Sequence, residues 1–244
     1  MSDALVIIPT YNEKENIENI IRAVFALSKP FHVLIVDDGS PDGTADIVKR
    51  LQAAEFHENL HLEQRSGKLG LGTAYIHGFR WAIAKGYDYI IEMDADFSHN
   101  PSDLPRLYEA CKPEGVGMSV GSRYVAGGKV ENWPLSRRMI SQGGSFYVRM
   151  ITFMPVKDAT AGFVCYKRTA LEQLNFDKIH FIGYAFQIEM KFALYQLGFK
   201  IKEVPITFKD REVGVSKMST KIFKEALLGV IKMRWFALTD TYKA

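Results

Sequence analysis

The chain has 244 residues, of which 47% are hydrophobic and 24% are charged. That is the composition of a globular protein with one large α/β domain or two small ones, and no apolar stretch reaches the ~18 residues of a membrane-spanning helix. The net charge of +3 divides unevenly, because residues 1–110 hold 10 Lys and Arg against 17 Asp and Glu, and the remainder holds 21 against 11. The acidic half suits a metal site and the basic half suits phosphates or an anionic membrane surface. No basic helix or aromatic–basic alternation supports nucleic acid as a partner.

Short apolar runs alternate with segments of helical periodicity in the first half of the chain. We expect strands at 4–8, 32–36, 60–64, 89–93 and 116–121. We expect helices at 17–27, at 44–54 with Thr44 as its cap, from the Gly-rich turn 67–72 to 85, and at 101–110. This alternation predicts a mostly parallel sheet with helices on both faces.

The pattern loosens beyond residue 124, but it continues without a linker or an internal repeat. We expect helices at 135–154, 186–197 and 222–236, and strands at 162–166 and 200–208. The interpretation is a single domain, with a catalytic part at 1–220 and an amphipathic helix at 221–244 that belongs to the same domain. Cys111 and Cys165 form no metal-ligand pattern, which favours a reducing, cytoplasmic compartment. The first residues run directly into a strand, so we expect no secretory signal.

Three acid-containing clusters, at 10–13, 37–42 and 94–98, each follow a predicted strand. The carboxyl ends of parallel strands meet at one rim of the sheet, where ligands bind near a topological switch point. Asp94 and Asp96 are spaced so that both side chains share a face of an extended chain. Such a pair needs a cation, and Mg²⁺ is held by one or two carboxylates plus substrate phosphates. A helix cap or turn is the alternative for an isolated pair of this kind, but it does not predict three such clusters.

Six short motifs occur in order between about residues 5 and 219. They are Pro-Thr-Tyr-Asn-Glu at 9–13, Val-Asp-Asp-Gly-Ser-Pro-Asp-Gly-Thr at 36–44, Gly-Leu-Gly-Thr-Ala at 70–74, Asp-Ala-Asp-Phe-Ser-His at 94–99, Gly-Ser-Arg-Tyr at 121–124, and Asp-Arg-Glu-Val-Gly-Val-Ser-Lys at 210–217. Together they resemble the inverting family 2 glycosyltransferases, and among these the polyprenyl-phosphate (dolichol-phosphate) mannose synthases. The resemblance implies a GT-A-like, Rossmann-like α/β fold.

The implied reaction moves mannose from GDP-mannose to a dolichyl or undecaprenyl phosphate with Mg²⁺ or Mn²⁺. A phosphate acceptor is already ionised at neutral pH, so the site needs no strong general base. It has to position two anionic reactants and neutralise the leaving diphosphate.

The resemblance assigns the nucleotide to residues at the strand ends and on a late loop. They are Pro9, Tyr11, Glu13, Val36, Asp38, Asp94, Ala95, Asp96, Arg211 and Lys217. The metal falls to Asp96 and Ser98, although relatives often carry Gln at the latter position, which leaves the choice of metal open. His99 is either a further ligand or a structural residue.

The acceptor phosphate falls to Arg123, Arg137 and Ser141, because the planar fork of Arg grips two phosphate oxygens. Arg138 is expected to be a solvated surface residue. With Asp94, Asp96 and Arg123, Glu189 completes the residues expected to be catalytic; it steers the sugar or an arginine, or else forms a buried salt bridge. Relatives commonly carry Arg where Val164 stands, so any contact of that Arg would be missing here.

Two basic segments rich in aromatic residues, 139–153 and 222–236, suit a membrane interface, although packing against the sheet explains such stripes equally well. We therefore expect a peripheral enzyme at the cytoplasmic face of the membrane, reaching the bilayer directly or through a membrane partner protein. Two alternatives stay open. One is the same fold using UDP-glucose or another nucleotide sugar with a different acceptor, and the other is a nucleotide-sugar-binding protein without catalysis.

Overall fold

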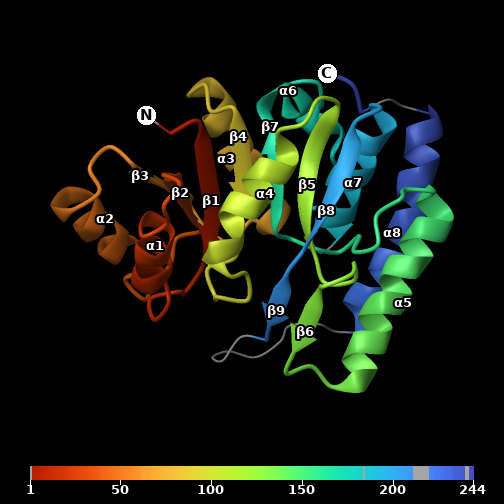
Figure 1. Cartoon of the computed structure of the whole chain (residues 1–244), viewed down its shortest axis with the longest axis horizontal. Helices are drawn as coiled ribbons and strands as arrows, with labels where there is room; N and C mark the ends of the chain where they lie inside the picture. Colours follow the sequence, from red (N-terminus) through yellow and green to blue (C-terminus); the bar gives the residue numbers. More distant parts are fainter. Residues whose placement is uncertain (1, 184, 211–219, 240–241) are drawn as a thin grey trace.

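The computed structural model describes residues 2–183, 185–210, 220–239 and 242–244, and on the last helix it describes side chains from 228 to 237. In this part of the chain, seven strands form one sheet in the order β3-β2-β1-β4-β7-β5-β8 (Figure 1). The strands are β1 (Ala4–Thr10), β2 (His32–Asp37), β3 (Leu60–Gln64), β4 (Tyr89–Glu92), β5 (Val116–Ser122), β7 (Val164–Lys167) and β8 (Lys200–Pro205). Only β7 among them runs against its neighbours, so the predicted mostly parallel α/β sheet is confirmed.

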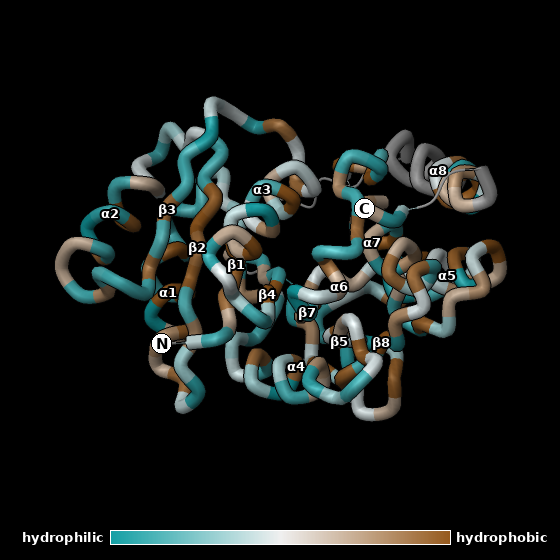
Figure 2. Tube along the Cα trace, turned by 90° about the horizontal axis from the view of Figure 1, so that it is seen from above, coloured by the Kyte–Doolittle hydropathy of each residue, from teal (hydrophilic) through white to brown (hydrophobic). Residues whose placement is uncertain are grey.

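Helices cover both faces of this sheet. They are α1 (Ile17–Phe25), α2 (Thr44–Ala54), α3 (Leu71–Ala84), α4 (Leu104–Cys111), α5 (Leu135–Thr152), α6 (Arg168–Leu171), α7 (Ala185–Gln196) and α8 (Thr220–Thr239). Seen from above, α1 and α4 lie on one side of the sheet, and α3 and α7 lie on the other (Figure 2). Each face has its own hydrophobic cluster, one beneath α1, α2 and α4 and one beneath α3, α5, α7 and α8.

The central strand β1 shows why the sequence forms this layered core. Its residues 4–8 are all apolar and fully buried, as expected of a parallel strand that is covered on both faces. Leu5 and Ile7 belong to one cluster, whereas Ala4, Val6 and Ile8 belong to the other. The alternation follows from the two-residue period of a strand.

The order of the strands creates a switch point beside β1. The chain runs outward from β1 through β2 to β3, and α3 then returns it to β4 on the opposite side of β1. Thr10 pairs with Asp37 at the carboxyl ends of β1 and β2, and Ile7 pairs with Glu92 on β4. The loops after β1, β2 and β4 therefore open into one crevice, as the sequence predicts.

The prediction of a single strand at 200–208 is wrong, because the chain leaves the main sheet after β8. Pro205 lacks a backbone N–H, and Ile206 donates its own to the carbonyl of Ser122. The chain then forms β9 (Thr207–Lys209), which pairs in parallel with β6 (Lys129–Glu131) in a second, two-stranded sheet. The sequence did not predict β6, whose three largely exposed residues carry no hydrophobic pattern.

The prediction that Thr44 caps α2 is also wrong. Gly43 occupies the cap position with φ 89°, and no side chain caps the helix there. Thr44 is already helical and fully buried, and its hydroxyl donates to Asp42 Oδ1 at 2.6 Å. Asp42 also accepts the backbone N–H of Thr44 and of Lys14. A carboxylate with two acceptor oxygens replaces the hydroxyl as the group that satisfies these donors.

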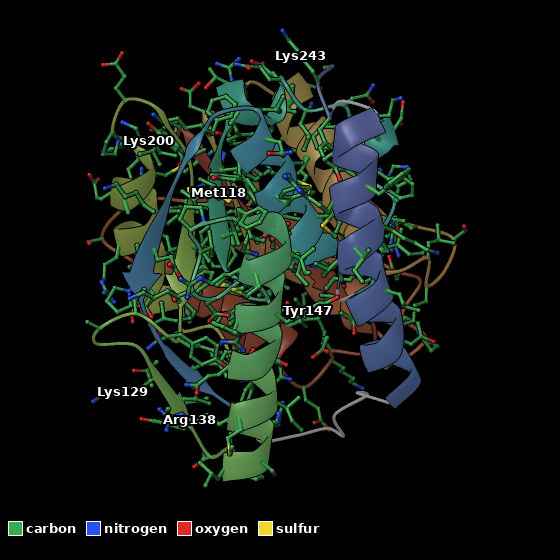
Figure 3. The ribbon with its side chains drawn as sticks, turned by 90° about the vertical axis from the view of Figure 1, so that its right-hand side faces the viewer. Met118, Lys129, Arg138, Tyr147, Lys200 and Lys243 are labelled. Carbon is green, nitrogen blue, oxygen red and sulfur yellow. The ribbon has the colours of Figure 1, made fainter. Side chains whose placement is uncertain are left out.

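Helices α5 and α8 lie side by side along one edge of the molecule (Figure 3). The residues that α5 buries are small, namely Ser145, Val148 and Thr152. Several of its large apolar side chains are exposed, with Phe146 at 62% and Phe153, just beyond the helix, at 68%, whereas Tyr147 and Ile151 pack against the core. None of the helices in the described ranges has the length and hydropathy required to span a membrane.

Candidate functional site

The loops after β1 and β2 are joined by a hydrogen-bonded network around Asp37. Its Oδ1 accepts from the hydroxyls of Thr10 and Ser40, and its Oδ2 accepts the backbone N–H of Ser40. Asp37 is fully buried. Of the acidic cluster at 37–42, Asp37 and Asp42 thus fix the loops, and Asp38 remains the candidate for a ligand.

The loop after β1 is held against this network by its backbone. Asn12, with φ 61°, donates its N–H to Ser40 Oγ, and Glu13 donates its N–H to Thr44 Oγ1. Tyr11 is left partly exposed, and Lys68 Nζ lies 4.8 Å from the centre of its ring. A partly exposed aromatic face at the rim of the crevice is a surface on which a nucleobase can stack.

Asp38 forms a buried ion pair with Arg65, a residue that the sequence analysis did not identify. Arg65 Nε donates to Asp38 Oδ1 at 2.7 Å, and each side chain is 9% exposed. Arg65 Nη1 donates to Thr73 Oγ1 at the start of α3. The pair leaves Asp38 Oδ2 as an acceptor beside a guanidinium donor. Guanine and uracil both present an N–H next to a carbonyl, which is the complementary pattern.

Two other predicted nucleotide residues lie deeper. Val36 is fully buried in the core and Ala95 is 4% exposed. These two residues could therefore contact a nucleotide only through their backbone atoms. Pro9 is the penultimate residue of β1 and lies at the carboxyl-terminal rim of the sheet. These assignments remain predictions.

The loop that follows β4 has the form of an Asx turn. Asp96 Oδ1 accepts the backbone N–H of Ser98 at 3.1 Å, and Phe97 between them has φ 59°. His99 Nδ1 accepts the N–H of Asp94 at 3.1 Å, and the buried His99 ring stacks on Phe163 at 4.8 Å. Because that nitrogen is occupied, the geometry favours the structural reading of His99: it holds the Asp-x-Asp loop in place.

The carboxylates of this loop fit a hard cation. Asp94 and Asp96 are half-buried, whereas Ser98 is 4% exposed and is the less accessible of the two predicted ligands. Asp96 lines a pocket of about 460 Å³ together with Asn16, Phe97, Asn100, Thr207, Lys209 and Asp210. Among the described residues, no three His, Cys, Asp or Glu side chains form a closed metal site. One or two carboxylates with open positions are what a cation that is also bound by substrate phosphates requires.

Arg123, predicted to meet the acceptor phosphate, is held by Asp158. Nε and Nη2 each donate to this fully buried carboxylate at 2.7 Å, and Nη2 also donates to Thr160 Oγ1. Within the described residues, Nη1 makes no hydrogen bond. Arg123 can therefore offer one nitrogen to a phosphate rather than a two-pronged grip. Asp158 lies 35 residues along the chain from Arg123, and this pairing could not be read from the sequence.

Arg137 and Ser141 lie on the next helix, α5, close to Arg123. Arg137 pairs with Asp210, and its guanidinium carbon lies 4.2 Å from the centre of the Trp133 ring. Ser141 Oγ accepts from Tyr124 Oη at 2.7 Å, so the proton of Ser141 remains available to an anion. The structure thus brings the three predicted acceptor residues into one neighbourhood, with Arg138 exposed as expected.

Glu189 is fully buried and engaged. It accepts the backbone N–H of His180 and of Phe181, each at 2.9 Å, and the hydroxyl of Tyr242. Burial raises the pKa of its carboxyl. These contacts hold the loop before α7, and a contact with the sugar remains a prediction. Arg211 and Lys217 lie outside the described residues.

A buried polar group beneath the crevice also escaped the sequence analysis. Glu92 at the end of β4 accepts from Gln187 Nε2 at 2.8 Å, and Lys191 Nζ donates to the carbonyls of Ala161 and Gln187. Glu92 stands within an apolar run of the sequence, which hides its role. The residues next to Lys191 in the sequence do not indicate that its side chain is buried. The group ties β4, α7 and the loop at 158–163 together under the Asp-x-Asp loop.

Comparisons with known proteins identify the family of the chain. The sequence matches the model of glycosyl transferase family 2 over residues 5–174. A polyprenol monophosphomannose synthase of Mycolicibacterium smegmatis is 44% identical over 226 residues, which cover 93% of this chain and 84% of the relative. An undecaprenyl-phosphate mannosyltransferase of Micrococcus luteus is 46% identical over 231 residues, which cover 95% and 93%.

Solved structures share the fold at low sequence identity. A mannosyltransferase of Pyrobaculum calidifontis in complex with GDP-Man and Mn²⁺ has a TM-score of 0.61 at 17% identity, over 99% of this chain and 66% of that chain. Glucosyl-3-phosphoglycerate synthase of Mycobacterium tuberculosis, in complex with Mn²⁺, UDP and its product, has a TM-score of 0.63 at 18% identity, over 96% and 78%. The chain therefore belongs to glycosyltransferase family 2, is a glycosyltransferase, and has the GT-A fold that its six motifs predicted.

Proposed function

We propose that the protein is a polyprenyl-phosphate mannose synthase that transfers mannose from GDP-mannose to a dolichyl- or undecaprenyl-type phosphate, with inversion at the anomeric carbon. The observation that carries the proposal is the adjacency of two anion sites. Phe208 on β9 packs against His99 of the Asp-x-Asp loop and lies 5.3 Å from the guanidinium carbon of Arg123. The names of the two curated relatives support a lipid-phosphate acceptor.

The chemistry asks for positioning rather than for a base. A phosphate oxygen of the acceptor attacks the anomeric carbon, the new carbon–oxygen bond forms, and the bond to the diphosphate breaks with its electron pair leaving on GDP. The nucleophile is already ionised, so no proton has to be removed. Arg123, Arg137 and Ser141 would hold the acceptor phosphate, while Tyr11 and Asp38 would hold the nucleoside.

Asp96, with Ser98 and the diphosphate, would hold Mg²⁺ or Mn²⁺. When bound, that cation offsets charge on the leaving diphosphate. The binding of Mn²⁺ in the mannosyltransferase and glucosyltransferase neighbours is consistent with this role. Arg211 and Lys217, which follow β9 in the sequence, would add cationic groups near the same diphosphate.

We also propose that the protein reaches its lipid as a peripheral protein at the cytoplasmic membrane face, through α5 and α8. On α8, Val230 and Met233 pack into the core, whereas Leu228, Ile231 and Trp235 are exposed. One face of the helix thus packs against the core, as one sequence interpretation expects, and the exposed face is the one that we propose for the membrane contact. Arg138, on α5, lies on the same edge of the molecule (Figure 3). Exposed apolar side chains flanked by basic residues are typical of interfacial helices.

The test is a transfer assay with separate donor and acceptor arms. The protein is incubated with Mn²⁺ or Mg²⁺, radiolabelled GDP-mannose or UDP-glucose, and undecaprenyl phosphate, undecaprenol or 3-phosphoglycerate. We expect label in the organic phase only with GDP-mannose and undecaprenyl phosphate, and no product from the alcohol. Asp96→Asn is the inactive control, and Asp46→Asn on the exposed side of α2 is the matched active control.

Each other outcome contradicts a defined part of the proposal. Label from UDP-glucose would assign another donor, and label in 3-phosphoglycerate would assign a soluble acceptor. Absence of product in every arm, with retained nucleotide binding, would point to a binding protein.

A further inference from the structure

Trp133, in the segment between β6 and α5, lies between the two arginines predicted to bind the acceptor phosphate. The guanidinium carbons of Arg137 and Arg123 lie 4.2 and 5.4 Å from its ring centre. Phe208 packs edge-on against the same ring at 5.5 Å. A ring face attracts guanidinium groups, so Trp133 can hold two like charges close together and partly offset their repulsion.

Among the described residues, none is a hydrogen-bond partner of the indole nitrogen of Trp133. Nε1 is buried and makes no hydrogen bond within the described part of the chain. An indole N–H can only donate, and leaving a buried donor unpaired costs free energy. The named neighbours of the ring are two cations and one apolar ring, none of which accepts a hydrogen bond from it. The missing partner is therefore an acceptor, and the two adjacent guanidinium groups favour an anionic one.

The other donors around the ring match a phosphate monoester. Arg123 keeps Nη1 after Asp158 and Thr160 have taken its other nitrogens. Arg137 already holds a carboxylate, that of Asp210, which shows that its side of the ring accommodates an anion. A phosphate monoester carries three peripheral oxygens, one for each of these donors. Trp133 thus adds a third donor to those of the two arginines in this neighbourhood.

We propose that Trp133 is a binding residue for the acceptor phosphate: its Nε1–H donates to a phosphate oxygen, and its ring fixes the spacing of Arg123 and Arg137. This rests on the proposed function, since it takes a prenyl phosphate monoester as the ligand. Phe208, which touches both Trp133 and His99, fixes this ring relative to the donor loop. The role cannot be filled by phenylalanine, because the indole supplies a hydrogen-bond donor as well as a ring face.

The test separates the donor from the ring. Trp133→Phe keeps an aromatic face and removes the N–H, and Trp133→Leu removes both. Binding of farnesyl phosphate is measured by calorimetry in the presence of GDP and Mn²⁺, and KM is measured for undecaprenyl phosphate and for GDP-mannose. We expect Trp133→Phe to weaken farnesyl phosphate binding by roughly tenfold, the scale of one hydrogen bond to a charged group. Its Tm and its KM for GDP-mannose should stay those of the wild type.

Trp81→Phe is the matched control. Trp81 lies on α3, packs with Tyr87, and touches neither Arg123 nor Arg137. A direct readout comes from a Trp81→Phe, Trp235→Phe background, in which Trp133 is the remaining tryptophan; farnesyl phosphate should shift its emission, and sodium chloride at equal ionic strength should not. Equal affinity of Trp133→Phe and wild type for farnesyl phosphate would overturn the proposal, as would an unchanged emission. A wild type that binds farnesyl phosphate but transfers no mannose would refute the proposed function and leave the Trp133 comparison readable.

Discussion

At the scale of single residues, Glu92, which lies beneath the crevice, has a strongly raised pKa. It is fully buried, and one of its oxygens has no hydrogen-bond partner in the described part of the chain. Burial raises the pKa of Glu92 to about 8, and burial lowers the pKa of Lys191 to about 8. Near neutral pH the carboxyl is therefore mostly protonated, so it acts as a neutral hydrogen-bonding group beneath the Asp-x-Asp loop rather than as a third charge.

Glu92 makes stability depend on pH. The carboxyl titrates near 4.5 in the unfolded chain and near 8 in the fold, so the stability it contributes is complete below the first value and is lost as pH rises towards the second. Because burial lowers the pKa of Lys191 to about 8, this lysine adds to the same loss of stability only as pH approaches that value. We expect Glu92→Gln to gain about 2 kcal/mol relative to wild type between about pH 5.5 and about pH 7.5. Urea unfolding at both pH values measures this, and a pH-independent difference would contradict a raised pKa.

Asp96 belongs to the same scale, because one carboxylate is expected to carry the metal dependence. Asp96→Asn keeps the size of the side chain and its acceptor for the Ser98 N–H, but removes the charge. We expect turnover at saturating Mn²⁺ to fall by about 100-fold or more, with the Mn²⁺ concentration needed for half-maximal rate rising. Removal of metal with EDTA should abolish the wild-type reaction, and Asp46→Asn should behave as wild type. Identical Mn²⁺ dependence in Asp96→Asn would exclude Asp96 as a ligand.

Sequence reasoning named candidate ligand groups, but it did not identify the residues that hold them. Asp38, Asp96 and Arg137 could be named from their resemblance to family positions, and their contacts with ligand remain predictions. The ion partners Arg65 and Asp158 could not, since each pairs across 27 or 35 residues of chain. Pairing at such separations depends on the closed tertiary structure, which a motif does not encode.

At the scale of elements, strands and helices of strong periodicity were predicted almost to the residue, whereas edges and small elements were not. β3 was predicted at its observed bounds, because a β-rich run lies between clear helical segments. The break between β8 and β9 was missed, because alternation continues across Pro205 while the pairing partner changes from β5 to β6. Periodicity reports which face is buried, and it does not report which strand lies alongside.

The contact between α3 and α7 depends on a glycine. A Cβ at Gly72 would lie 2.7 Å from Phe186 Cδ2 and 3.0 Å from Ile182 Cα. We expect Gly72→Ala to destabilise the protein by about 1–3 kcal/mol, because Phe186 is buried and the backbone at Ile182 has to move. Gly143→Ala is the matched control in mid-helix on α5, where nothing lies within 4 Å, and it should stabilise by about 1 kcal/mol. Thermal unfolding of both variants measures the contrast, and equal shifts would mean that α3 and α7 are not in this contact.

At the scale of the whole molecule, the acidic and basic halves of the sequence correspond to different parts of the fold. The acidic residues of the first half supply the donor loops beside β1, β2 and β4, and the basic second half supplies α5 and α8. A soluble nucleotide sugar and a membrane-bound phosphate would thus approach from different sides of one crevice. The basic edge favours an anionic surface, and the acidic edge would be repelled by it, so charge alone favours one orientation of the protein on a bilayer.

This orientation predicts a specific pattern of vesicle binding. We expect the protein to co-sediment with vesicles that contain about 30% anionic lipid, and binding to weaken as salt rises, because each Lys or Arg at the surface contributes about 1 kcal/mol that salt screens. The double variant Phe146→Ser, Met150→Ser removes two exposed side chains of α5 and should lower binding by about tenfold or more at any salt concentration, since it removes buried apolar area rather than charge. Leu69→Ser, at a similarly exposed position outside the two helices, should bind as wild type does.

The double variant Phe146→Ser, Met150→Ser should also lose transfer to undecaprenyl phosphate in vesicles while keeping transfer to farnesyl phosphate in solution. Loss of both reactions would mean that α5 supports the active site itself, and loss of neither would remove the helix from the membrane contact.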